Sequence, residues 1–296
     1  MATASHPGTS PDLPTLTFTD APVRIAHVRL NRPGKLNSLT LPVLDELISI
    51  AGRIRADRTV RTVVLAGEGR SFCAGLDFAS AMGRPRALAA SFVPRPWRGT
   101  NQFQEACWAF RRLPVPVIAA VHGHCFGGGL QLAMAADWRF TTADAQWSIL
   151  ESKWGLIPDM SGLQSLSQQL RADVLKRLTM TGETVDGAQA VEYGLASEVV
   201  EVPVAAGSVD GAGSDTDADG VIAAAVDLAE QIATRSPDAA AYGKRLIDET
   251  WTRGARATFA RERIRQFRLL VASNTKLAQQ AAARKVAPVF TRRNVR

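Results

Sequence analysis

Two glycine-containing loops are the first features of the sequence that indicate chemistry. One spans residues 71–77 (SFCAGLD). The other spans residues 122–137 (HGHCFGGGLQLAMAAD), and each follows an apolar run. A strand that ends in such a loop and then opens a helix leaves backbone N–H groups unpaired, and the helix dipole strengthens their attraction for anionic oxygen. One amide from each loop would hold a carbonyl oxygen that becomes an enolate. The two loops therefore predict an oxyanion-stabilising site.

Other motif assignments fit these loops poorly. The glycines are contiguous rather than spaced as G-x-G-x-x-G, and no G-K-[ST] follows them, so neither a dinucleotide fingerprint nor a P-loop is present. His122 and His124 lie beside Cys125, but a zinc site needs a further ligand, and the remaining histidines are His6 and His27. No base partner is evident for Cys125 or for Cys73, so we expect neither a metal nor a cysteine nucleophile.

The pattern around the loops predicts a scaffold that brings two strand ends together. Residues 23–30 alternate in polarity, and residues 62–67 and 115–121 are short apolar runs, so all three are expected to be strands. Thr40 can cap a helix whose apolar residues follow the 3–4 spacing of a packed face. A further helix is expected over residues 129–136. Strands that alternate with helices predict an α/β sheet with right-handed crossovers.

The rest of the chain separates into segments of different composition. Residues 1–15 are expected to be a disordered leader, residues 79–100 are expected to be irregular, and residues 204–220 form a low-complexity acidic linker. From residue 221 onward only helices are expected. In the stretch TVDGAQAVEYGL we expect a helix over residues 187–193, with Asp186 as its N-cap and Gly194 as the residue that ends it.

Length and composition restrict the class of protein. The 296 residues are 46% hydrophobic, which suits one large domain or one domain with a helical appendage. The chain has only three cysteines, an odd number that does not suit a disulfide framework and that indicates a reducing compartment. The N-terminus has no apolar core typical of a signal peptide, and the uncharged run 113–136 is interrupted by proline, histidine and glycine. We therefore expect a soluble, cytoplasmic protein.

The net charge of +7 and pI of about 9.8 favour a polyanionic ligand, and both nucleic acid and a nucleotide-bearing cofactor such as coenzyme A fit. Part of the charge lies on one C-terminal helix, where arginines surround an apolar stripe that includes Ile264 and Phe267. We interpret it as an amphipathic helix with a solvated or subunit-facing basic side, while binding to a membrane surface or to nucleic acid stays open.

The motifs taken together resemble those of the crotonase superfamily, the enoyl-CoA hydratases and isomerases. The resemblance runs from about residue 16 to residue 293, and its order and spacing are specific. It implies a ββα spiral core over residues 16–203 and a C-terminal helical trimerisation region over residues 221–296, with residues 204–220 as an insertion. The matching stretches are LNRPGKLNSL, VVLAGEGRSFCAGLD, AAVHGHCFGGGLQLAMAAD, ESKWGLIPDMSGLQSL, TGETVDGAQAVEYGLASEVV and APVFTRR.

The resemblance also implies a substrate and a set of binding residues. The substrate would be a coenzyme A thioester, with no cofactor beyond the coenzyme A that the substrate carries. The amides of Leu76 and Gly128 would form the oxyanion hole, and a homotrimer or hexamer is implied. The remaining substrate- or CoA-binding positions are Arg32, Lys35, Leu36, Ala74, Asp77 and Gln131, with Arg32 or C-terminal cations meeting the phosphates.

The acid residues decide between reactions within this family. In its hydratases two glutamates flank the double bond; the first falls at Gln131 here, and the second falls at Glu151. An amide cannot accept a proton at neutral pH, so a two-glutamate hydration mechanism lacks one member. Asp159 stands where the family's dienoyl-CoA isomerases carry an aspartate. Those enzymes also keep an aspartate at the position of Gln131, so the match to them is partial.

Alternatives exist for each of these side chains. Asp159 would instead cap a helix that starts near residue 160, Glu151 would be a structural carboxylate, and Gln131 would be an inert amide or would orient water or the thioester. Trp147 and Trp154 bracket Glu151, and an apolar surround would raise the pKa of its carboxyl.

The sequence thus predicts an enoyl- or dienoyl-CoA isomerase with Glu151 as the main acid/base and Asp159 as its partner. The alternatives are a hydratase, a weakly catalytic acyl-CoA-binding protein, or an RNA-binding protein. On this prediction Gln131→Glu raises hydration of crotonyl-CoA from a low base. The acyl chain length is not readable from the sequence.

Overall fold

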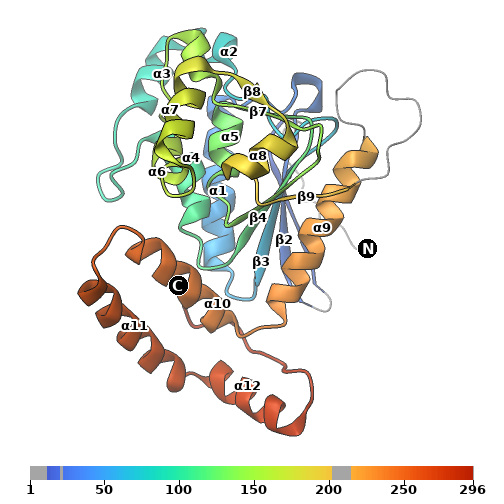
Figure 1. Cartoon of the computed structure of the whole chain (residues 1–296), viewed down its shortest axis with the longest axis vertical. Coiled ribbons are helices and arrows are strands. Elements are labelled where there is room, and N and C mark those ends of the chain that lie inside the picture. Colours follow the sequence, from blue (N-terminus) through green and yellow to red (C-terminus); the bar gives the residue numbers. More distant parts are fainter. Residues whose placement is uncertain (1–11, 21–22, 202–214, 296) are drawn as a thin grey trace.

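The computed structural model describes residues 12–20, 23–201 and 215–295 of the chain (Figure 1). Within them, six strands form the main sheet in the order β1-β2-β3-β4-β6-β9. β1 is antiparallel to β2, and every other neighbouring pair in this sheet is parallel. The strands are β1 (Thr15–Thr19), β2 (Ile25–Leu30), β3 (Thr62–Gly67), β4 (Val117–Val121), β6 (Trp138–Thr141) and β9 (Glu198–Val199).

A smaller sheet lies against the ends of the main strands. It contains β5 (His124–Phe126), β7 (Gln146–Ser148) and β8 (Thr184–Val185) in the order β5-β7-β8. The loop after β3 joins it through Cys73, whose N–H donates to the carbonyl of His124 (2.8 Å) and whose carbonyl accepts from the N–H of Phe126 (2.9 Å). These bonds bring the two glycine loops together, as the sequence predicts.

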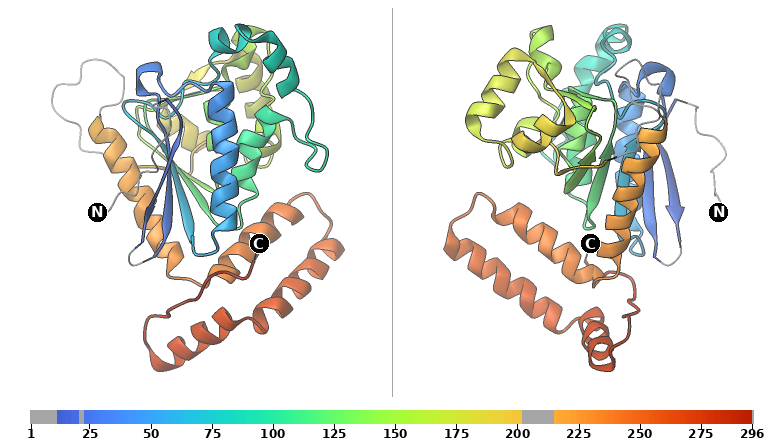
Figure 2. Two further views of the ribbon diagram at one scale, coloured as in Figure 1. Left: turned by 180° about the vertical axis from the view of Figure 1, so that it is seen from behind. Right: turned by 45° about the vertical axis from the view of Figure 1, so that its right-hand side comes forward.

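Helices cover both faces of the main sheet (Figure 2). On one face α1 (Leu41–Ala56) packs beside α4 (Gln102–Arg111), and the Thr40 side chain caps α1 by accepting from the N–H of Val43. On the other face lies α9 (Asp215–Ala233). Successive residues of β3 alternate between these two apolar cores, because side chains of a strand point to opposite faces of a sheet.

Helix α9 differs from what the sequence predicts. It begins at Asp215, inside the expected linker 204–220, of which residues 204–214 lie outside the described residues. Its buried Val221, Ala225 and Ala229 pack on the sheet, so α9 belongs to the core rather than to the appendage. The N-terminal boundary also differs, since β1 begins at Thr15, in the expected leader, whose residues 1–11 lie outside the described part.

The segment 79–100 is not irregular throughout, which corrects that expectation. It contains α2 (Phe78–Met82) and α3 (Pro85–Ser91). The Asp77 side chain caps α2 by accepting from the N–H of Ser80 (3.1 Å), and a proline opens α3. Both helices are too short to show an apolar period in the sequence.

The remaining helical elements lie in the connections between strands of the two sheets. The Asp186 cap and the Gly194 stop of α8 are confirmed, because Asp186 accepts from the N–H of Gln189 and Gly194 is left-handed. No helix among the described residues is both long and apolar enough to span a membrane, and a cytoplasmic location stays a prediction. The helical elements between the strands are α5 (Gly128–Ala133), α6 (Gly162–Leu166), α7 (Ala172–Thr181), α8 (Gly187–Tyr193) and the 3-10 turns η1 (Pro33–Lys35) and η2 (Leu150–Trp154).

Three C-terminal helices extend from the bottom of the molecule in Figure 1: α10 (Pro237–Thr250), α11 (Ala255–Leu270) and α12 (Ser273–Arg284). The chain after them returns to the core. The buried guanidinium of Arg293 donates to the carbonyls of Ile54, Arg55 and Asp57 at the end of α1. Asp238 on α10 accepts from the N–H groups of Asn294 and Val295, and these bonds hold the segment after α12 against α10.

Candidate active site

Both glycine loops open into one cavity of about 640 Å³. Its walls come from the loop after β3, from α2, α3 and α4, from the start of α5, and from η2 with the segment between η2 and α6. The polar side chains among its lining residues are those of Gln131, Glu151 and Asp159. The other lining residues are Ala74, Gly75, Leu76, Phe78, Ala81, Met82, Leu88, Phe92, Phe103, Gly127, Gly128, Leu150, Trp154, Leu156, Ile157 and Met160.

Leu76 and Gly128 bring two free amides to this cavity. Among the described residues, neither N–H donates a hydrogen bond to the protein, and Gly128 is the first residue of α5, where helix geometry leaves the N–H unpaired. The loops touch each other, because a Cβ built on Gly75 would lie 2.9 Å from the carbonyl oxygen of Phe126 and 3.6 Å from the nitrogen of Gly128. Such a pair of amides can hold an anionic oxygen.

Packing within the chain itself accounts for two of the three contiguous glycines, Gly127 and Gly129. Gly127 has a φ of +49°, and a Cβ there would lie 3.3 Å from Glu151 Oε1. A Cβ at Gly128 would lie 2.7 Å from the Met160 sulfur, and one at Gly129 would lie 2.6 Å from the Cβ of Cys73. At Gly128 the nearest atom belongs to the flexible end of the Met160 side chain, so the close approach of a thioester oxygen stays the predicted reason for this glycine.

Glu151 is the most buried acid of the cavity. It follows β7 in η2 and is 9% exposed. Burial raises the pKa of Glu151 above its ordinary value and the charge of Asp159 adds to this, while a backbone hydrogen bond and the Gln131 amide oppose the shift. Its Oε2 atom is buried and has no hydrogen-bond partner among the described residues. A carboxyl with a raised pKa and one unpaired oxygen is suited to taking and returning a proton.

Asp159 is half-buried, and burial raises its pKa as well. The alternative that it caps the next helix is wrong, because α6 starts at Gly162 and is preceded by Ser161, in the left-handed region with a φ of 67°. The N–H groups of Met160 and Gly162 are instead taken by the Gln131 side chain. Asp159 thus reaches the cavity without a helix-capping role.

Gln131 is hydrogen-bonded at both ends of its amide. Its Nε2 donates to Glu151 Oε1 (2.6 Å), and its Oε1 accepts from the N–H groups of Met160 (2.7 Å) and Gly162 (2.9 Å). The side chain is 1% exposed. Protein groups therefore occupy both ends of the amide, and the part that Gln131 plays in the reaction stays a prediction.

Aromatic side chains surround the acids differently from what the sequence suggests. Trp154 lines the cavity and lies with its ring centroid 5.6 Å from that of Phe78. Trp147 is fully buried, donates to the Thr141 hydroxyl and is not a lining residue. Sequence reasoning missed the wall formed by α2 and α3, for which the Asp77 cap and Pro85 were the available signals.

Four of the positions proposed for substrate or nucleotide binding lie beside the cavity rather than in its lining. Arg32 contacts Asp77 (3.4 Å) and donates to the carbonyl of Ser38 (2.7 Å). Lys35 is exposed, and Leu36 is left-handed, with its carbonyl accepting from the N–H of Ala74 (2.9 Å). The other two binding positions, Ala74 and Gln131, line the cavity.

The histidines and cysteines are engaged in packing. His122 bonds to the carbonyl of Gly69, and His124 bonds to the Ser71 hydroxyl. Among the described residues no three or more histidine, cysteine or acidic side chains are grouped to hold a metal. Burial raises the pKa of Cys73 to about 12 and that of Cys125 well above its ordinary value, which keeps both thiols protonated.

A mainly parallel sheet, a second small sheet and two strand-end loops that present free amides over an acid-containing cavity define a crotonase fold. The chain belongs to the enoyl-CoA hydratase/isomerase family, whose family model matches residues 20–292. A solved structure of a putative enoyl-CoA hydratase from Streptomyces coelicolor A3(2) superimposes with a TM-score of 0.79 at 29% identity and covers 97% of both chains.

Relatives with different reactions are similarly distant. (E)-benzylidenesuccinyl-CoA hydratase of Thauera aromatica is 33% identical over 60% of this chain and 66% of its own length. Mitochondrial Delta(3,5)-Delta(2,4)-dienoyl-CoA isomerase of Mus musculus is 31% identical over 75% of this chain and 65% of its own length. Carnitinyl-CoA dehydratase of Proteus mirabilis is 30% identical over 76% of this chain and 77% of its own length. The chain spans just under two thirds of the length of the first two of these relatives.

Proposed function

We propose that the chain is an acyl-CoA isomerase that shifts a carbon–carbon double bond of an enoyl- or dienoyl-CoA. The observation that carries the proposal is the combination of two free amides, Leu76 and Gly128, with two carboxyls of raised pKa, Glu151 and Asp159, in one apolar cavity. The proposal needs no cofactor beyond the coenzyme A of the substrate.

The chemistry follows from the charges. Ionised Glu151 removes a proton from an activated carbon, and the electron pair moves onto the thioester oxygen, which the two amides hold as an enolate. One such preorganised donor is typically worth about 3 kcal/mol in the transition state. The proton then returns at another carbon, from Glu151 for a short shift or from Asp159 for a longer one. Isomerisation relocates a proton and requires no second reactant.

Hydration is the second candidate. The presence of Asp159 in the cavity favours it, because a second carboxyl would assist Glu151 in activating a water molecule. Isomerisation is preferred because the amide of Gln131 accepts no proton and is already bonded at both ends. A weakly catalytic acyl-CoA-binding role is the third candidate.

The proposal is tested by turnover on 2-enoyl-, 3-enoyl- and 3,5-dienoyl-CoA substrates, with hydration and isomerisation followed separately. We expect isomerisation to dominate, Glu151→Gln to lower kcat by roughly a hundred- to ten-thousand-fold, and Asp159→Asn to slow the dienoyl shift more than the short enoyl shift. Efficient hydration of crotonyl-CoA by the wild type would establish the second candidate instead. Tight binding of every substrate without turnover would leave the third.

For the nucleotide of coenzyme A we propose the exposed Lys35 together with the backbone of Leu36 and Ala74, next to the loop after β3. Arg32 is a weaker candidate than the sequence suggests, because its guanidinium already contacts Asp77 and the carbonyl of Ser38. Acyl-CoA is a polyanion, so its binding at this site would account for the positive net charge without nucleic-acid binding.

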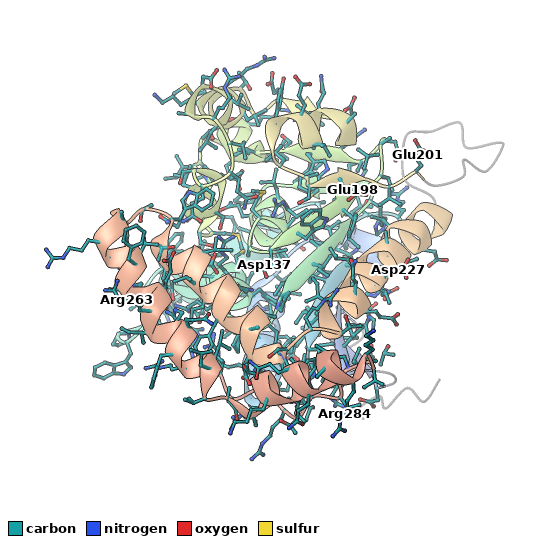
Figure 3. All side chains as sticks on the ribbon, turned by 60° about the horizontal axis from the view of Figure 1, so that its bottom comes forward. Asp137, Glu198, Glu201, Asp227, Arg263 and Arg284 are labelled. Carbon is teal, nitrogen blue, oxygen red and sulfur yellow. The ribbon has the colours of Figure 1, made fainter. Side chains whose placement is uncertain are left out.

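We also propose that the chain assembles as a trimer or hexamer through α10–α12. In the part of the chain that the structure describes, α11 buries none of its side chains, and Phe259, Ile264 and Phe267 are more than half exposed. These helices lie at the end of the molecule away from α2 and α3 (Figure 1), and Figure 3 shows their outer surface, with Arg263 on α11 and Arg284 on α12. An apolar stripe between arginines is suited to another copy of the chain.

A further inference from the structure

The hydrogen bonds of Gln131 connect three parts of the cavity that are far apart in the sequence. Its backbone lies in α5, which begins at the free amide of Gly128. Its Nε2 holds Glu151 in η2, and its Oε1 holds the turn of residues 160–162, directly after Asp159. Packing leaves this side chain little freedom, because a Cβ on Gly162 would lie only 2.5 Å from Gln131 Cγ.

The orientation of the amide is set by its partners. The N–H groups of Met160 and Gly162 can only donate, so they must face the amide oxygen, and the NH₂ group must then face Glu151. Because Glu151 Oε1 accepts from this NH₂ group, the carboxyl proton is favoured on Oε2, the oxygen that has no partner among the described residues.

A carboxylate at position 131 would behave differently. One oxygen could still accept from the same two N–H groups, but the other would face Glu151 Oε1 at a separation of about 2.6 Å. Two carboxylates so close cannot both be ionised and would share one proton, so their titration would belong to the pair. The amide supplies a donor at every pH and leaves Glu151 as a single titrating group.

We propose that Gln131 is the positioning residue of this site: it places Glu151 and the Asp159 turn relative to the Gly128 amide, and it directs proton transfer to Glu151 Oε2. The inference rests on the proposed function, in which Glu151 is the acid/base, and it deepens that proposal by assigning the part played by the amide. Gln131 itself transfers no proton.

The test uses two variants of Gln131 and one control in the full-length protein, with Glu151→Gln as the reference. Gln131→Met keeps the size of the side chain and removes both sets of hydrogen bonds, and Gln131→Glu keeps an acceptor for the two N–H groups. The matched control is Gln164→Met, which changes an exposed glutamine of α6 outside the cavity. Thermal unfolding of all three identifies any variant that fails to fold.

The first measurement needs no substrate. The pKa of Glu151 is followed by infrared difference spectroscopy of its carboxyl band, which is assigned by its loss in Glu151→Gln. Gln131→Met should raise this pKa, since an opposing hydrogen bond is removed. Gln131→Glu should split the titration into two steps, and Gln164→Met should leave it unchanged. An identical titration in wild type and Gln131→Met would overturn the inference, whichever reaction the protein catalyses.

The second measurement is the pH dependence of kcat and KM on the best substrate. Gln131→Met should lower kcat by about ten- to a hundred-fold with KM little changed, the size expected for losing a hydrogen bond to a charged group. Gln131→Glu should recover part of kcat only while the introduced carboxyl holds its proton, so a descending alkaline limb should appear. If Glu151→Gln abolishes turnover but Gln131→Met keeps kcat and the pH profile of the wild type, the positioning role fails while the proposed function stands. If Glu151→Gln retains turnover, the proposed function itself fails.

Discussion

Single residues of the cavity carry a cost in stability that follows from their burial. Glu151 and Asp159 both have pKa values above their ordinary ones, chiefly because burial disfavours the charged form. The folded state therefore binds their protons more tightly than the unfolded state does. Between the unfolded and folded pKa values the folded protein holds more protons, so their contribution to stability falls as pH rises through this window.

This gives a prediction in which activity and stability move in opposite directions. Glu151→Gln and Asp159→Asn should be at least as stable as the wild type at neutral pH, because each removes a buried charge. The advantage should vanish at a pH below the ordinary carboxyl pKa, where the wild-type carboxyls are protonated. Melting temperatures recorded from acid to neutral pH check this. A loss of stability at neutral pH that shrinks at acidic pH would show that the carboxylates stabilise the fold instead.

At the scale of elements, α2 and α3 form one wall of the cavity that we propose for the acyl group. They contribute apolar side chains, and no lysine, arginine or histidine is among the described lining residues. An acyl group with a second carboxylate would be desolvated there without a counter-charge, next to two acids. The benzylidenesuccinyl-CoA hydratase of Thauera aromatica is named for an acyl group of that kind.

We therefore expect neutral apolar acyl-CoAs to be preferred over carboxylated ones of the same length. Discrimination in kcat/KM should be at least about tenfold, since an unpaired buried charge costs several kcal/mol or forces protonation. Competition between a neutral enoyl-CoA and its ω-carboxylated analogue measures it. A preference for the carboxylated substrate would mean that a cation from elsewhere enters the site.

The sequence predicts those elements that carry their own signals. Helix α1 shows an apolar face and a Thr40 cap, and α8 lies between Asp186 and Gly194, so both are correctly predicted. The start of α9 is missed because its first turns, DTDADG, are acidic and end in glycine, and only contact with the sheet reveals the helix. Sheet pairing across the chain leaves no local signal either.

For the site, too, the sequence predicts the residues that belong to motifs but not the contacts between distant segments. The motif resemblance places Leu76, Gly128, Gln131, Glu151 and Asp159 in one site, and the structure brings these five to one cavity. The bonds of Gln131 to Met160 and Gly162 could not be predicted, because they depend on side-chain geometry between segments 29 and 31 residues apart. The contact between Arg32 and Asp77 is hidden for the same reason.

For the whole molecule, the tail after α12 joins the helical extension to the core. Arg293 is fully buried and donates to three carbonyls at the end of α1. Burial lowers the pKa of its guanidinium only to about 10, so it stays charged at neutral pH. Carbonyls at a helix C-terminus have no partners within the helix, and a cation there also complements the helix dipole.

Arg293→Met should therefore destabilise the protein by about 2 kcal/mol and loosen α10–α12 from the core. Arg292→Met is the matched control, because the neighbouring arginine is exposed. Chemical denaturation gives the first quantity, and hydrogen exchange in α10–α12 gives the second. Equal effects from both arginines would refute this role of the tail.

Assembly provides the second prediction at this scale. Phe267 is 66% exposed on α11 and lines a groove between α10 and α11. Phe267→Glu should weaken the proposed trimer, because it places a charge in an apolar contact, whereas Arg256→Glu changes an exposed position on the same helix. Light scattering measures the mass at micromolar concentration. A monomeric wild type would exclude assembly through this surface under those conditions.

The hydrogen-bonded glutamine at position 131 also has an evolutionary consequence. Glutamine and glutamate codons differ by a single first-position base, so a carboxylate at this position is one point mutation away. The N–H groups of Met160 and Gly162 are already arranged to donate to one oxygen of that carboxylate. A random mutagenesis library selected for water addition should therefore recover changes at this codon before changes at sites that need two base substitutions.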